Sequence, residues 1–175
     1  WGLYKGKLLY NFVDNHDVSR IATMLNNKRL LPVIYPLLFT MPGIPGVYYG
    51  SEVGIEGDKH NGDDALRVEY NEEKFRNEGI CDLSGEISAL CKLRTSSSAL
   101  SGGNYTPLQL TNRQFSFRRD GEGETVVTLL NIDEAPFDFN PGISGEFTDV
   151  LTGNKIDLSQ SVHIEGCSAV VAVNK

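Results

Sequence analysis

Two short apolar runs, separated by one amphipathic segment, open the chain. Leu8–Val13 and Ile44–Tyr49 are apolar and rich in β-forming residues, so they predict two buried strands. Between them, Arg29–Met41 carries apolar residues at helical spacing. A long polar loop, Ser51–Gly79, precedes a second amphipathic helix at Ser84–Arg94. This βαβα order predicts a parallel sheet covered by helices.

The pattern changes after the polar stretch Thr95–Ser98 and the pair Gly102–Gly103. From there on, short apolar runs alternate with turn residues, which is typical of an antiparallel β-sandwich. We therefore expect an α/β region over residues 1–100 and an all-β region over residues 101–175, with the boundary near Ser101. The predicted strands lie at Leu108–Leu110, Phe115–Arg118, Thr125–Leu130, Phe137–Phe139, Phe147–Leu151, Val162–Ile164 and Ala169–Val173.

Composition excludes several classes of partner. The net charge is −7 and no Lys/Arg block occurs, which argues against nucleic acid. No apolar run approaches the roughly 18 to 20 residues that cross a bilayer, so no membrane partner is expected. The three cysteines are an odd number, which favours reduced thiols and the cytoplasm, with secretion left open. Cys81 and Cys91 are expected to pack as small apolar residues. Neither a metal nor a cofactor is expected.

The first candidate for chemistry is the polar cluster Asp14, Asn15, His16 and Asp17, which directly follows the first predicted strand. In a parallel sheet, ligands bind beyond the carboxyl ends of the strands, where a rigid strand positions solvent-exposed side chains. A structural interpretation carries about equal weight. Asp14 and Asn15 then turn the chain, and the other two residues begin the next helical turn, for which Ser19 is the predicted cap.

Two motifs carry a family resemblance. Phe12–Asp17 (FVDNHD) and Met41–Glu52 (MPGIPGVYYGSE), with one helix between them, resemble motifs of the α-amylase family of glycoside hydrolases. The similarity continues through Gly62–Arg67 (GDDALR) and an all-β C-terminal region, so it covers essentially the whole chain. It implies that the first region is the last two strand–helix units of a (β/α)8 barrel.

The resemblance also implies roles for single residues. Asp17 matches the family's third essential carboxylate, which stabilises the transition state by hydrogen bonding to sugar hydroxyls. His16 matches a histidine that binds the same sugar. The implied substrate is an α-glucan or maltooligosaccharide. Weaker candidates for the sugar-binding rim, for which a structural role is at least as well supported, are Asn15, Arg20, Tyr49, Asp64 and Arg67.

The catalytic pair of a retaining glycosidase has no match in this sequence. Such enzymes need a nucleophile and a general acid/base, and in the α-amylase family both lie on earlier barrel strands. The loop carboxylates, Glu52 and Glu56 among them, sit in no comparable motif. The chain begins at Trp1 and enters structure almost at once, which suggests a piece of a longer protein. We therefore expect the chain alone to be inactive.

Three hypotheses remain at this point. The chain is the C-terminal part of a retaining glycosidase that hydrolyses or transfers α-glucosidic bonds, or it is an autonomous carbohydrate-binding or structural β-module. A third, weaker hypothesis is an unrelated hydrolase that uses His16 as a general base. The two predicted barrel strands would expose unpaired edges and apolar faces, so we also expect the chain to self-associate.

Overall fold

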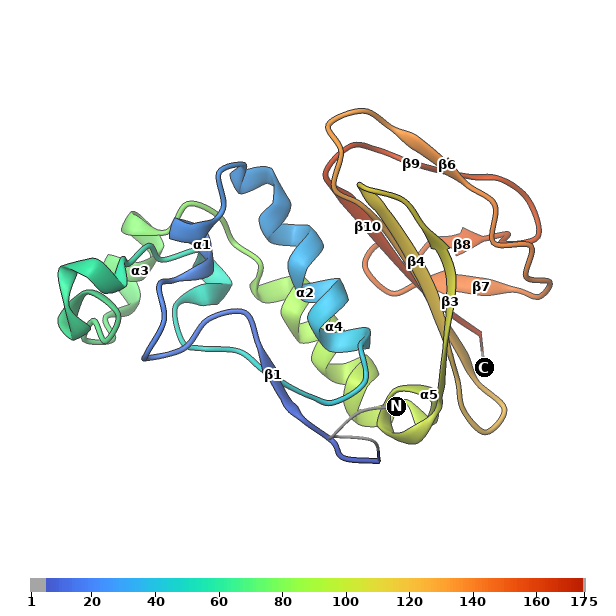
Figure 1. The fold of residues 1–175 in the computed structure, drawn as a ribbon, viewed down its shortest axis with the longest axis horizontal. Coiled ribbons are helices and arrows are strands. Elements are labelled where there is room, and N and C mark those ends of the chain that lie inside the picture. The colour runs from blue at the N-terminus through green and yellow to red at the C-terminus, as the bar shows by residue number, and fades with distance from the viewer. Residues whose placement is uncertain (1–5, 175) are drawn as a thin grey trace.

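The computed structural model describes residues 6–174, so Trp1 lies outside the described residues. Helices and 3-10 turns dominate up to residue 102, and strands follow (Figure 1). The elements are β1 (Tyr10–Phe12), α1 (Ile21–Met24), η1 (Lys28–Leu30), α2 (Leu31–Thr40), β2 (Ile44–Gly46), η2 (Ser51–Val53), η3 (Lys59–Asn61), η4 (Asp63–Ala65), α3 (Glu72–Glu78), α4 (Ser84–Ser96), α5 (Ser98–Gly102), β3 (Asn104–Leu110), β4 (Gln114–Asp120), β5 (Thr125–Asn131), β6 (Phe137–Phe139), β7 (Phe147–Asp149), β8 (Lys155–Ile156), β9 (Val162–Ile164) and β10 (Ser168–Asn174).

The first region contains the predicted parallel pair. β1 and β2 run parallel, with Tyr10 opposite Ile44 and Phe12 opposite Gly46, and α2 connects them. Both strands are shorter than predicted. The paired ladder extends over only three residues on each strand, and Pro45 at its centre has no N–H to donate.

The second region is an antiparallel sandwich with unequal layers. One sheet has the strand order β3-β4-β5-β10-β7-β8, and β6 and β9 pair as a separate ribbon. A buried cluster fills the space between the two layers and includes Leu129, Phe139 and Ile164. The short strand β8 was not predicted, because two residues carry no periodic signal.

Helix α2 joins the two regions. It packs beside α4 and also against β5 and β10 of the large sheet (Figure 1). Val33 of α2 contacts the cluster formed with Phe117 and Leu130. Helix α5 spans the predicted boundary at residue 101, and β3 begins at Asn104. The division into 1–100 and 101–175 stays a prediction.

Two arginines hold the C-terminal end of α2. Buried Arg119 of β4 donates to the carbonyl of Thr40 at 2.9 Å and to those of Leu100 and Gly103 at 3.2 and 3.1 Å. Arg94 of α4 donates to the Phe39 carbonyl at 3.1 Å, as well as to those of Met41 and Gly43. The last carbonyls of a helix lack intrahelical partners and carry partial negative charge, so these guanidinium groups satisfy them.

Two local predictions were wrong. Ser19 does not cap the first helical turn; the Asp14 carboxylate accepts the Ile21 N–H instead, at 2.9 Å. Cys91 is exposed, because it lies one position after buried Leu90 and so points away from the inward face of α4. The prediction for Cys81 is confirmed, because its half-buried side chain packs against the core cluster that includes Leu83 and Leu90.

The long polar loop also contains a helix, α3, that was not predicted. Its only buried residue is Phe75, so no apolar stripe marks it in the sequence. The Asn71 side chain caps it by accepting the Lys74 N–H at 2.8 Å.

Candidate functional site

The candidate site lies where the chain leaves β1 and β2. Because these strands are parallel, the segments that follow them, Asp14–Arg20 and Val47–Ser51, meet at one edge of the pair. The side chains of His16 and Asp17 are 54% and 61% exposed at the outer end of the first segment. A ligand approaching this edge would meet these two side chains first.

Three of the sequence-predicted residues come together around the Asp17 carboxylate. His16 Nε2 lies 3.2 Å from Asp17 Oδ2, and the Arg67 guanidinium donates to Oδ1 at 3.1 Å. Arg67 Nε also donates to the His16 carbonyl at 3.3 Å. Each carboxylate oxygen of Asp17 therefore has its own nitrogen partner, which fixes the orientation of the carboxylate.

Asn15 lies in the same turn, where it shapes the backbone. Its side-chain oxygen accepts the Asp17 N–H at 2.7 Å, which is the geometry of an Asx-turn. This hydrogen bond fixes the direction in which the Asp17 side chain leaves the backbone. The structure therefore gives Asn15 a definite structural role, and its contact with sugar stays a prediction.

Arg20 occupies a different place from the one expected for a sugar-binding rim. Its side chain is fully buried, and its guanidinium donates to the carbonyls of Tyr49 at 2.7 Å and Leu66 at 2.8 Å. Its Cζ lies 4.1 Å from the ring centroid of Tyr48. A group with no exposed surface cannot reach a ligand at this edge, so Arg20 supports the site from below.

Tyr49 is half-buried beneath the same edge. Its hydroxyl donates to the Val68 carbonyl at 2.6 Å, and its ring stacks on Phe75 with centroids 6.0 Å apart. Asp64 lies exposed in η4, and within residues 6–174 it makes no hydrogen bond or ion pair with His16 or Asp17. The sugar contacts of both residues stay predictions.

The loop that carries Arg67 is held by charge. Lys59 pairs with Asp63, and Asp63 also lies 3.7 Å from the Arg67 guanidinium. The hydrogen bond from Lys59, together with the charges of Lys59 and Arg67, holds the pKa of Asp63 below its usual value. The loop thus presents Arg67 to Asp17 with an ionised neighbour on its other side.

The sequence analysis missed Tyr48. Its ring lies 6.4 Å from that of His16 and 4.6 Å from that of Tyr49. Burial and the neighbouring Tyr49 raise the pKa of Tyr48, against an opposite effect of nearby Arg20 and Arg67. The sequence placed Tyr48 inside the predicted strand Ile44–Tyr49, whereas β2 ends at Gly46 and Tyr48 lies in the segment after it, where ligand contacts occur in parallel sheets.

Comparisons with known proteins agree with this geometry. The family model described as "Alpha amylase, catalytic domain" matches residues 3–87. A cyclomaltodextrinase from Thermoanaerobacter pseudethanolicus is 30% identical over 128 residues, which cover 71% of this chain and 21% of that protein. Alpha-amylase 2 from Dictyoglomus thermophilum is 28% identical over 152 residues, which cover 82% of this chain and 26% of that protein. The chain belongs to the α-amylase family.

A solved structure confirms the fold class. The α-amylase of Geobacillus thermoleovorans, complexed with acarbose, superposes with a TM-score of 0.78 at 21% identity over 95% of this chain and 38% of that chain. The fold is therefore a partial (β/α)8 barrel followed by an antiparallel β-region. The chain described here spans 21% of the length of the Thermoanaerobacter cyclomaltodextrinase and 26% of that of the Dictyoglomus α-amylase.

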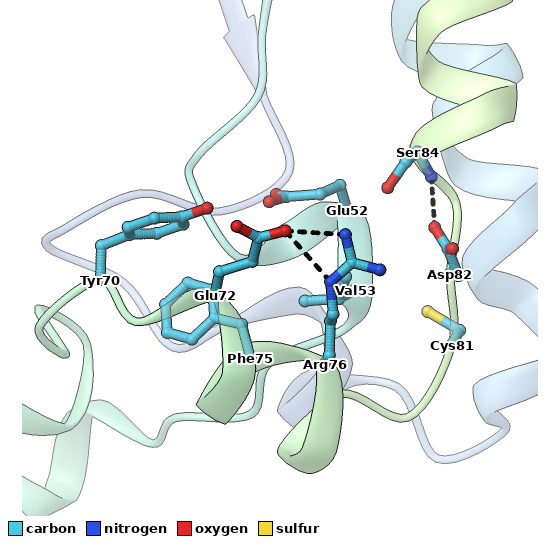
Figure 2. A pocket seen from close by; sticks show the side chains of 9 residues that line it. All are labelled: Glu52, Val53, Tyr70, Glu72, Phe75, Arg76, Cys81, Asp82 and Ser84. Carbon is cyan, nitrogen blue, oxygen red and sulfur yellow. Dashed lines mark hydrogen bonds and ion pairs between the residues drawn. The ribbon is translucent and has the colours of Figure 1, made fainter.

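A cavity of about 460 Å³ lies beyond Tyr49, because Phe75, on which the Tyr49 ring stacks, is one of its lining residues. Figure 2 shows the ion pair between Glu72 and Arg76 in its wall, with the Asp82 carboxylate accepting the Ser84 N–H. Within residues 6–174, no group of three or more His, Cys, Asp or Glu side chains is placed to hold a metal ion. Among the same residues, no helix is both long enough and apolar enough to cross a bilayer.

Proposed function

We propose that this chain forms one wall of the active site of a retaining glycosidase that acts on α-glucosidic bonds of starch-derived oligosaccharides. The observation that carries the proposal is the convergence of His16, Asp17 and Arg67 at the carboxyl edge of a parallel strand pair, in a chain of the α-amylase family. Relatives named cyclomaltodextrinase and α-amylase support an α-glucan as the substrate.

The proposed role of Asp17 follows from its exposure and its partners. An ionised carboxylate can accept two hydrogen bonds from the hydroxyls of one sugar ring, and such bonds stabilise the transition state when they tighten on ring distortion. His16 adds a polar contact to the same sugar. Arg67 holds the Asp17 carboxylate in one orientation before substrate arrives.

The chain supplies only part of the catalytic machinery. A retaining mechanism needs two carboxyl groups about 5 to 5.5 Å apart that both reach the scissile bond. Of the two carboxylates that follow β1, only Asp17 is exposed, since Asp14 is 1% exposed. We infer that the nucleophile and the acid/base lie outside this chain, which is therefore inactive alone.

Self-association through the barrel-derived region is part of the proposal. Leu8, Tyr10 and Ile44 are 63%, 64% and 50% exposed on or beside the β1–β2 pair. Apolar surfaces of this kind find a partner in solution, either a second copy or the remaining part of a barrel.

A binding titration of the chain tests the proposal. We expect maltoheptaose to bind with a dissociation constant of about 1 mM or weaker, since only one wall is present, and to shift the NMR signals of His16 but not those of His163. An aryl α-glucoside should not be hydrolysed. Micromolar binding that maps to residues 104–174 would support the autonomous β-module instead. Turnover by the chain alone would support His16 as a general base.

A further inference from the structure

A buried polar network lies directly beneath the exposed loop. Asp14, Arg20 and Ser51 are each no more than 1% exposed, although two of them carry charge. They come from the two segments that meet at the site, since Asp14 and Arg20 follow β1 and Ser51 follows β2. Burying charged groups is costly unless hydrogen bonds satisfy them, so such a network needs a physical account.

Ser51 connects the two charges. Its hydroxyl lies 2.9 and 3.0 Å from the two oxygens of Asp14, to which it donates, and it accepts from Arg20 Nη1 at 3.4 Å. Asp14 Oδ2 also accepts the Ile21 N–H at 2.9 Å. Asp14 therefore closes the loop from residue 14 to residue 21 on itself and fastens it to the segment after β2.

Helix α2 supports the network from the opposite side. The Tyr35 hydroxyl donates to the Ser51 carbonyl at 3.4 Å. Burial raises the pKa of Tyr35, and the negative charge of Asp14 raises it further. Asp14 is thus hydrogen-bonded to Ser51 and to the Ile21 N–H, and Arg20 is linked to it through Ser51. Tyr35 from α2 interacts with the charge of Asp14, and the Glu52 carboxylate also acts on Tyr35.

The network reaches His16 through Arg20 and Tyr48. The Arg20 guanidinium lies over the Tyr48 ring, and that ring is the aromatic neighbour of His16. The loop that carries His16 and Asp17 is therefore closed by the hydrogen bond between Asp14 and the Ile21 N–H. Buried Arg20 supports the same loop through the Tyr48 ring, which lies beside His16.

We propose that Asp14 and Ser51 are positioning residues that hold His16 and Asp17 in the geometry needed to bind sugar. This inference rests on the proposed function. Misplacement of a catalytic group by about 1 Å can cost roughly a hundredfold in rate, so partial loosening of this loop should be visible in the kinetics.

The first test uses the longer protein that contains this chain. Ser51→Ala removes the hydroxyl bridge, and we expect kcat and kcat/KM on a maltooligosaccharide to fall together by about tenfold, because positioning acts in the transition state. Ser51→Thr keeps the hydroxyl and should restore most of the loss. Ser159→Ala is the matched control, because the exposed Ser159 hydroxyl also donates to an aspartate, Asp157 at 2.7 Å, but lies in the sandwich, outside the network. It should behave as wild type.

The second test does not depend on activity. In the NMR spectrum of this chain, Ser51→Ala should move or broaden the Hε1 signal of His16 and leave that of His163 in β9 unchanged. A role in folding alone would change both signals or neither. If Ser51→Ala does not fold, Asp14→Asn takes its place. This variant keeps one acceptor oxygen but removes the second oxygen and the charge, so it should also shift the His16 signal.

The outcomes separate the two proposals. If the longer protein shows no glycosidase activity, the proposed function fails, and the His16 signal alone decides whether Asp14 and Ser51 position the loop. If the protein is active and Asp17→Asn abolishes activity, while Ser51→Ala leaves both kcat and the His16 signal unchanged, the positioning role is overturned and the proposed function stands.

Discussion

The two regions of the molecule differ in how completely they bury their apolar residues. Around the β1–β2 pair, large side chains such as Tyr10 and Ile44 are at least half exposed. In the sandwich, Val126, Leu129 and Phe139 are fully buried. The candidate site belongs to the first region. The residues proposed to bind substrate are therefore carried by the part with the less complete core.

The first region contains two exposed His–Asp pairs, His16–Asp17 and His60–Asp58, and the sandwich contains His163–Asp138. The contrast between the first and the last of these pairs is informative. His16 and Asp17 are 3.2 Å apart, while His163 and Asp138 are 2.7 Å apart. Asp17 has Arg67 as its second partner, whereas His163 has Glu165 at 3.7 Å. The sandwich pair lies side by side on the two-stranded ribbon β6–β9, but the first pair lies beyond the end of β1 in a parallel strand pair. The surroundings, and not the pair itself, mark the candidate site.

The largest expected loss of stability comes from removing Arg119, which links the two regions. Arg119→Ala would leave the carbonyls of Thr40, Leu100 and Gly103 without their donor in a buried setting. Each unsatisfied buried acceptor costs about 1 to 3 kcal/mol, so we expect the free energy of unfolding to fall by about 3 kcal/mol or more. Urea unfolding measures this loss.

The control is the exposed arginine variant Arg113→Ala, whose ion pair with Asp133 spans 3.7 Å. It should change the free energy of unfolding by less than about 0.5 kcal/mol. Equal effects would contradict a role for Arg119 in joining the regions.

A smaller effect concerns Glu86 at the start of α4. Burial raises the pKa of Glu86 from its ordinary value to about 7, and its Oε1 has no hydrogen-bond partner among the described residues. A raised carboxyl pKa means that the folded state holds the proton more tightly. The contribution of protonated Glu86 to the free energy of unfolding is therefore complete below pH 4.5, and it is lost as the pH rises through 7.

Glu86→Gln removes this pH dependence. The variant should match wild type at pH 4 and be more stable by about 1 kcal/mol at pH 8. The effect stays this small because solvent still reaches part of the side chain and the first turn of a helix favours a carboxylate. Thermal unfolding at both pH values measures it. A variant that is less stable at pH 8 would show that the ionised carboxylate is well solvated.

The smallest expected effect on stability tests the exposed strand pair. Ile44→Lys places a charge on β2, where the native side chain is 50% exposed, so the free energy of unfolding should change by less than about 0.5 kcal/mol. Self-association, measured by sedimentation velocity, should decrease because the apolar surface is interrupted. The matched sandwich variant Leu110→Lys, also at an exposed position, should leave association unchanged. A wild-type chain that is monomeric at high concentration would contradict the expected self-association.

The sequence predicted the elements that have a strong period. Its strands at Phe137–Phe139 and Val162–Ile164 coincide with β6 and β9, and the helix expected over Arg29–Met41 contains α2. It did not predict α3, in which Phe75 is the only buried residue, or the length of β1 and β2, which depends on pairing partners. Periodicity reports burial, and these elements have little of it.

For the site, the motifs located His16 and Asp17 at the correct strand end, and the structure added Arg67 as the partner of Asp17. The sequence did not show that Arg20 is buried, because nothing local reveals that carbonyls from Tyr49 and Leu66 surround its guanidinium. It also did not connect Asp14 to Ser51, since that hydrogen bond joins residues 37 positions apart.

The most direct test of the account compares the His16–Asp17 and His163–Asp138 pairs in the longer protein. Asp17→Asn keeps the size of the side chain but removes its charge and one acceptor, and we expect kcat on a maltooligosaccharide to fall by about 10²- to 10³-fold while folding is retained. Asp138→Asn makes the same change in the sandwich pair and should leave kcat unchanged. If Asp17→Asn retained near-normal kcat, or if both variants lost activity equally, the account of this site would be wrong.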